Sequence, residues 1–367
     1  MDRFTVQYNI TCYEGENIDE KLRWICLEQS VELPEEVVPQ KILDKVTGNV
    51  GQVEQQSENQ FKVHIDWPVE NIGNDATQFL NILYGNISLK RGIKITSVDW
   101  SSLTGLLKGA RFGISGIREE FGIHDRAMAC GVLKPMGLSA DELSVQAKEF
   151  ALGGIDMIKD DHGLANQSYA PFEERVNRVA EVLQKAMTET GILTRYFPNI
   201  TTAGSKLMQQ YELAADLGAD GVMIIPELCG YESMHELAQS KLDLPVIAHP
   251  AFSGTFVTDP DHGFTPSFLY GELYRAFGAD FTVYPNTGGR FSFTPEECND
   301  LNDSARTLDS PFKPIFPMPG GGMKRETIPN WIKEYGKDTI FLLGASMLQH
   351  PGGIRKASEE VKEILQN

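Results

Sequence analysis

From Ala127 onward, short apolar runs alternate with amphipathic stretches, eight of each. The expected strands are 128–133, 155–159, 195–200, 221–225, 244–249, 280–284, 313–317 and 339–343. The expected helices begin near residues 141, 172, 205, 233, 266, 295, 326 and 353. Eight strand–helix units in about 230 residues predict a (β/α)₈ TIM barrel. A doubly wound open sheet is the main alternative, but no GxGxxG motif follows the first strand.

The chain before the barrel has a different pattern and predicts a separate α+β domain. Residues 4–13 alternate apolar and polar side chains, which is typical of a half-buried strand. Further strands are expected over 62–67 and 93–100, helices over 18–29 and 75–83, and a connector over 101–127. We therefore divide the chain into an N-terminal domain, residues 1–115, and a catalytic barrel, residues 116–367.

Charge and composition limit the possible partners. A net charge of −18 disfavours nucleic acid and anionic membranes as partners. No apolar run reaches the roughly 18 residues of a membrane span, and no signal peptide is recognisable. The five cysteines are scattered without a CxxC pair, which favours free thiols in a reducing compartment. These features predict a cytoplasmic protein that acts on a small molecule.

Polar residues follow the predicted strands at the end where barrel enzymes carry their chemistry. Lys134 follows the first strand, Lys159, Asp161 and His162 end the second, and His249 ends the fifth. Each has an ordinary structural explanation: a surface lysine, a helix cap, a buried structural histidine. However, the next amphipathic stretch begins near residue 172, too far from residues 159–162 for a cap. Their common position on one rim favours an active site.

The residue types at this rim suggest particular roles. Backbone N–H groups of Gly321, Gly322, Gly344 and Ala345 suit a phosphate, because a glycine has no Cβ to keep an anion away. Ser253 and Arg290 can hold a second anionic group. The carboxylates after the second strand suit Mg²⁺, and lysines with lowered pKa values can transfer protons. A cation beside a carbonyl and a nearby base are the groups needed for enolisation. A flexible turn is the plainer explanation of the glycines.

Five segments in this order resemble the large subunit of RuBisCO, and most closely its non-carboxylating RuBisCO-like branch (form IV). They are KPMGLS (134–139), GGIDMIKDDH (153–162), AHPAFSG (248–254), PGGGM (319–323) and LLGASMLQHPGG (342–353). Residues 28–34 and 80–88 resemble the N-terminal segments that reach into the neighbouring subunit's site. The resemblance implies a homodimer with shared active sites.

The resemblance also implies residue roles. Lys134 matches a proton-handling lysine, Lys159 a lysine that CO₂ converts to a metal-binding carbamate, and Asp161 a metal ligand. His249 matches a histidine near the substrate, and we expect it to supply a base for proton transfer together with Lys134. The matched phosphate-binding positions are Gly321, Gly322, Gly344 and Ala345. Glu28 and Asn86 match residues contributed by the neighbouring subunit.

The sequence departs from RuBisCO in three places. His162 stands where a second carboxylate ligand is expected, which weakens the case for Mg²⁺. The segment KPMGLS is one residue short and lacks a second lysine. After the sixth strand, PNTGGRFSF contains no lysine where the catalytic loop lysine belongs, so no CO₂ fixation is expected.

Several functions fit these residues. The first is an isomerase or enolase that moves a proton on a phosphorylated ketose or sugar acid, of the 5-methylthioribulose 1-phosphate or methionine-salvage type. The second is a decarboxylase of a phosphorylated 3-oxo sugar acid, such as 3-oxo-isoapionate 4-phosphate. The third is a non-catalytic barrel that binds a phosphosugar. A Schiff-base aldolase that uses Lys134 or Lys159 is a further alternative.

Overall fold

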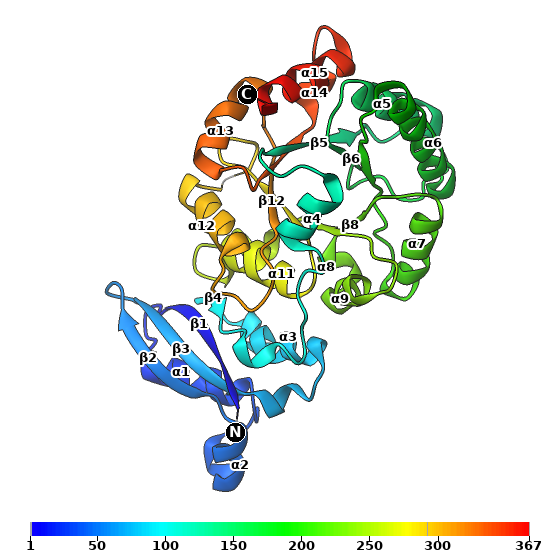
Figure 1. The fold of residues 1–367 in the computed structure, drawn as a ribbon. Coiled ribbons are helices and arrows are strands. Elements are labelled where there is room, and N and C mark those ends of the chain that lie inside the picture. Colours follow the sequence, from blue (N-terminus) through cyan, green and yellow to red (C-terminus); the bar gives the residue numbers. More distant parts are fainter. Residues whose placement is uncertain (1, 292, 367) are drawn as a thin grey trace.

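The computed structural model describes residues 2–291 and 293–366. A small domain lies beside a ring of parallel strands that is surrounded by helices (Figure 1). This is the α+β domain followed by a (β/α)₈ barrel that the sequence predicts.

The N-terminal domain is built on a five-stranded sheet in the order β10-β4-β1-β3-β2. Its strands are β1 (Arg3–Thr11), β2 (Asn49–Gln55), β3 (Gln60–Pro68), β4 (Ile93–Val98) and β10 (Gly263–Phe264). Its helices are α1 (Ile18–Glu28), α2 (Gln40–Val46) and α3 (Ala76–Tyr84). In β1 the predicted alternation is confirmed, since Phe4, Val6 and Tyr8 are fully buried. The edge strand β2 escaped prediction because every one of its residues is exposed, so no apolar face marks it.

The barrel strands form two four-stranded halves, β13-β5-β6-β7 and β12-β11-β9-β8. Their bounds are β5 (Met128–Leu133), β6 (Met157–Asp160), β7 (Arg195–Phe197), β8 (Val222–Ile224), β9 (Val246–Ala248), β11 (Phe281–Pro285), β12 (Phe316–Gly320) and β13 (Ile340–Leu343). A parallel bridge between Asn199 and Met223 joins the halves on one side. On the other side Gly320 lies directly against Leu342.

Helices cover the outside of the ring, as Figure 1 shows. They are α5 (Ala140–Leu152), α6 (Phe172–Thr190), α7 (Gly204–Asp216), α9 (Tyr231–Gln239), the π-helix η5 (Ser267–Leu273) with α11 (Tyr274–Ala276), α12 (Pro295–Arg306), α13 (Ile328–Tyr335) and α15 (Gly353–Gln366). Short helices follow three strands at the rim: α8 (Pro226–Cys229), α10 (Gly254–Val257) and α14 (Ala345–Leu348). The predicted start of α6 at Phe172 is confirmed, so residues 159–162 do not cap it.

The expected connector over 101–127 is wrong in part, because it contains helix α4 (Gly113–Phe121). Ile117 of α4 is fully buried in one cluster with the barrel residues Met128, Phe197 and Phe281. In Figure 1 α4 lies in front of the ring of strands. The proposed boundary at residue 115 falls within this helix, so we now place it before α4.

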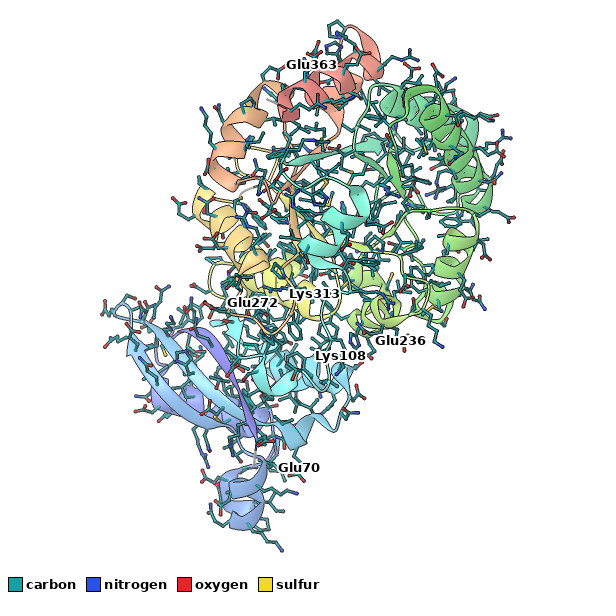
Figure 2. All side chains as sticks on the ribbon, in the orientation of Figure 1. Glu70, Lys108, Glu236, Glu272, Lys313 and Glu363 are labelled. Carbon is teal, nitrogen blue, oxygen red and sulfur yellow. The ribbon has the colours of Figure 1, made fainter. Side chains whose placement is uncertain are left out.

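The two domains share a polar junction. Glu272 of η5 accepts hydrogen bonds from Trp100 Nε1 (3.0 Å), Val98 N (3.2 Å) and Ser97 Oγ (3.2 Å). Figure 2 shows Glu272 where the barrel meets the N-terminal domain. The barrel segment β10 also extends the N-terminal sheet by pairing with β4. The rim after β9 is therefore fixed to the N-terminal domain.

Candidate active site

Lys134 and Asp161 meet at the carboxyl ends of the adjacent strands β5 and β6. The Lys134 Nζ atom lies 3.5 Å from Asp161 Oδ1. The backbone of Lys134 is fixed by Gln146 of α5, which accepts from Lys134 N (3.3 Å) and donates to Lys134 O (2.8 Å). Sequence reasoning missed Gln146, because a half-buried glutamine on a helix gives no distinct signal.

His162 lies against the same carboxylate oxygen, with its Nδ1 atom 3.5 Å from Asp161 Oδ1. Partial burial disfavours the Asp161 anion, but the His162 hydrogen bond and the charges of Lys134 and Lys159 outweigh it. The pKa of Asp161 is therefore held well below its ordinary value. This carboxylate is therefore ionised near neutral pH.

Lys159 is buried beneath the rim, with 1% of its surface exposed. Its Nζ atom donates to the carbonyl oxygen of Asp160 at 3.0 Å. Burial lowers the pKa of Lys159, and the nearby charge of Lys134 lowers it further. The carboxylates of Asp161 and Asp160 act in the opposite direction but do not cancel this effect. A lowered pKa makes proton transfer by the Lys159 amine easier.

His249 stacks on His162 from across the rim, with ring centroids 4.7 Å apart and planes 16° apart. Burial and the nearby Lys159 and His162 hold the pKa of His249 well below its ordinary value. Its Nδ1 atom accepts from Ala251 N at 3.2 Å. The proton of the neutral ring must then sit on Nε2. His249 is thus a hydrogen-bond donor rather than a base.

A buried network supports this cluster from below. Asp160 is fully buried and accepts from Arg175 Nε (3.1 Å), Tyr196 OH (2.9 Å) and Asn199 N (3.0 Å). The Asn199 side chain donates to the carbonyl oxygen of His162 at 2.9 Å. This network holds the loop that carries Asp161 and His162. The sequence places Asn199 at a strand end but gives no indication of this contact.

The predicted phosphate positions lie on neighbouring turns after β12 and β13. Gly321 and Gly322 have φ of +78° and +84°, and neither N–H group has a hydrogen-bond partner among the described residues. A Cβ on Gly344 would lie 3.6 Å from Lys134 Nζ, so the β13 turn adjoins the charged cluster. The hydroxyl of Ser346, next to Ala345, is buried without a partner in the described structure. These unused donors can bind an anion.

The predicted second anion site is not assembled. The Ser253 hydroxyl is buried, donates to Pro250 O (2.6 Å) and shares a hydrogen bond with Tyr270 OH (2.7 Å). Arg290 is exposed on the loop after β11, with its guanidinium carbon 5.8 Å from the centroid of the Phe291 ring. No interaction joins Arg290 to Ser253 in the described part of the chain. Sequence spacing could not show that Ser253 is already satisfied.

Glu28 and Asn86 lie together in the N-terminal domain. Asn86 Nδ2 donates to Glu28 Oε1 at 3.0 Å, and this contact is exposed. Within the described residues no hydrogen bond or ion pair joins either side chain to the barrel.

As the residues stand, they do not form a complete site for Mg²⁺. The described part of the chain contains no group of three or more His, Cys, Asp or Glu side chains placed to hold a metal. Asp161 is the one carboxylate of the cluster, and its Oδ1 atom already lies 3.5 Å from both Lys134 Nζ and His162 Nδ1. An amine does not replace the missing oxygen ligand, whereas a carbamate on Lys159 would supply one. Lys159, Asp161 and His162 therefore fit a metal only when Lys159 carries a carbamate.

Comparisons with known proteins agree with this geometry. Residues 113–290 match the family described as the ribulose bisphosphate carboxylase large chain, catalytic domain. The chain is 34% identical over 352 residues to a 5-methylthioribulose-1-phosphate isomerase of Rhodospirillum rubrum, covering 95% of this chain and 92% of that protein. It belongs to the RuBisCO large-chain family. It is a RuBisCO-like protein by its relatives, and these support an enzyme of the isomerase or enolase kind.

Two further relatives also match over most of both chains. A 2,3-diketo-5-methylthiopentyl-1-phosphate enolase of Bacillus licheniformis is 34% identical over 336 residues, 90% of this chain and 83% of that protein. The crystal structure of a Rubisco-like protein from Rhodopseudomonas palustris superposes with a TM-score of 0.90 at 31% identity, over 100% and 98% of the two chains. The fold of the family is thus preserved along the whole chain.

Proposed function

We propose that this protein moves a proton on a phosphorylated ketose or sugar acid through an enolate, as an isomerase or enolase, without fixing CO₂. One observation carries the proposal. Two amines and two imidazoles from β5, β6 and β9 surround the single carboxylate of Asp161, beside glycine turns with unused N–H groups. Two of the relatives are named for phosphates of this kind, the 5-methylthioribulose-1-phosphate isomerase and the 2,3-diketo-5-methylthiopentyl-1-phosphate enolase.

The residues divide the chemistry in a definite way. The N–H groups of Gly321 and Gly322 anchor the phosphate. Lys159, whose buried amine has a lowered pKa, or Lys134 removes the proton from the carbon next to the carbonyl. His249 donates its Nε2 proton in a hydrogen bond to the oxygen that gains negative charge. The ammonium so formed returns the proton to another carbon or to oxygen, which sets the product.

The proposal includes Mg²⁺ only with carbamylated Lys159. The neutral amine adds CO₂ and releases one proton, and the carbamate would hold the ion with Asp161 and His162. When bound, the ion would stabilise negative charge on the substrate oxygen. We further propose a homodimer in which Glu28 and Asn86 reach the partner's site.

We also propose that the protein acts in the cytoplasm, on the evidence of its cysteines and its helices. All five cysteines are free, and four of them are buried. Among the described helices none is long and apolar enough to cross a membrane.

The deciding experiment is NMR in D₂O with 5-methylthioribulose 1-phosphate, the diketo phosphate and a phosphorylated 3-oxo sugar acid. Each is measured with Mg²⁺ and bicarbonate, and with chelator. We expect deuterium beside the carbonyl and a new phosphate signal with one of the first two. Release of CO₂ from the third would replace the proposal with a decarboxylase. Exchange with none of them would leave a phosphosugar-binding barrel.

A further inference from the structure

The two sides of the rim differ in charge. The ends of β5 and β6 carry Lys134 and Lys159, and the turns after β12 and β13 offer N–H groups to an anion. The segments that follow β8 and β9, residues 225–230 and 249–258, contain no lysine or arginine. A phosphate is therefore attracted to one side only.

Phe252, on the side without lysine or arginine, is unusually exposed and unusually constrained. Its side chain is 73% exposed, and its φ is +70°, a value that bulky residues rarely adopt. The backbone on either side is fixed, because Ala251 N donates to His249 Nδ1 and the Ser253 hydroxyl is bonded to Tyr270. Strained residues held in this way are concentrated at ligand sites.

The turn that carries Phe252 is open, and an exposed apolar side chain lies at the end of the next strand. A Cβ on Gly254 would meet no atom within 4 Å, so space lies beside this turn. Leu228, at the end of the adjacent strand β8, is 49% exposed. The Ser253 hydroxyl is satisfied within the chain and offers nothing to a polar ligand.

We propose that Phe252 is a specificity residue that covers the non-phosphorylated end of the substrate and makes the enzyme selective for a monophosphate with an apolar tail. The inference rests on the proposed function for the identity of the phosphate. An apolar tail gains by leaving water against the ring. A hydroxyl or a second phosphate would lose hydration there without gaining a partner.

The test compares binding of two ligands by titration calorimetry. The probes are 5-methylthioribulose 1-phosphate and ribulose 1-phosphate, which carries a hydroxyl in place of the methylthio group. We expect the wild type to prefer the first at least tenfold, and Phe252→Gly to reduce this preference at least fivefold. Glycine accepts the backbone angle, so the variant keeps its fold. Leu308→Gly, which removes another exposed apolar side chain (85% exposed) far along the chain, should keep the wild-type preference.

The outcomes separate this inference from the proposed function. If deuterium exchange is absent but Phe252→Gly still reduces the binding preference, the proton-transfer function fails and the role of Phe252 stands. If Phe252→Gly keeps the full preference, the inference is wrong whatever the exchange shows. An unchanged preference with a weakened dimer would assign Phe252 to contact with a second copy instead.

Discussion

Asp160 and Asp161 are adjacent in the chain, yet they have opposite surroundings. Asp160 is fully buried and receives three hydrogen bonds from groups that are themselves fixed. Asp161 lies at the rim, where Lys134 Nζ and His162 Nδ1 each approach its Oδ1 atom at 3.5 Å. A carboxylate that is saturated by fixed donors holds structure, whereas one with titratable neighbours is suited to chemistry. The predictions below test this contrast.

The largest effect is expected at the open carboxylate. Lys134→Met removes an amine that can transfer the proton and leaves Asp161 without its lysine partner. We expect the rate of deuterium exchange to fall about a thousandfold, or roughly 4 kcal/mol in the barrier. Circular dichroism should show an unchanged fold. Retention of the wild-type rate would exclude Lys134 from proton transfer.

The buried carboxylate should respond in stability. Arg175→Met leaves Asp160 buried without its cation, which typically costs about 3–5 kcal/mol. The measurement is urea unfolding, with Asp161→Asn as the matched control, for which we expect a smaller loss of about 1–2 kcal/mol, because the lowered pKa of Asp161 means that its ionised form stabilises the fold. Adding Asp160→Asn to Arg175→Met should recover part of the loss. Equal losses for Arg175→Met and Asp161→Asn would contradict the contrast.

Glu272 is an intermediate case, because it is buried at the domain junction and receives three neutral donors. Burial raises its pKa to about 7 from an ordinary 4.5, against the hydrogen bonds from Trp100, Val98 and Ser97. The folded protein therefore keeps a proton that the unfolded chain loses, so the contribution of Glu272 to stability declines between pH 4.5 and 7 and is constant above. A shift of this size corresponds to about 3 kcal/mol at most.

Glu272→Gln should remove this decline. We expect unfolding free energies of wild type and variant to agree near pH 4 and the variant to be the more stable at pH 8. If the unfolding free energies of wild type and variant ran parallel over the whole pH range, burial would not raise the pKa of Glu272.

The smallest effect on stability is expected at the exposed pair. Glu28→Ala breaks only a solvent-exposed hydrogen bond to Asn86, so the free energy of unfolding should change by less than about 0.5 kcal/mol. If Glu28 serves the partner's site, activity should nevertheless fall about tenfold, or roughly 1.4 kcal/mol. When Glu28→Ala chains are mixed with Lys134→Met chains, a heterodimer would contain one shared site with neither substitution. The activity of the mixture should then exceed the sum of the activities of the two separate variants. Additive activities would argue against shared sites.

The fold was largely predictable because its pattern is local. Each buried strand of the barrel is a short apolar run, and all eight predicted runs overlap an observed strand. Helix α4 was not predictable, since its role depends on the barrel interior that it closes. Strand β2 was missed because it has no buried face.

The sequence by itself determined which residue types stand at the rim: Lys134, Lys159, Asp161, His162 and His249. Their positions follow from strand ends, which neighbouring residues define. Tertiary structure alone decided which groups are already satisfied. The hydroxyl of Ser253 is bonded to a tyrosine 17 residues away, and Asp160 to a backbone N–H 39 residues away. A residue's chemistry depends on the donors and charges that remain unused around it, and only the folded chain brings these together.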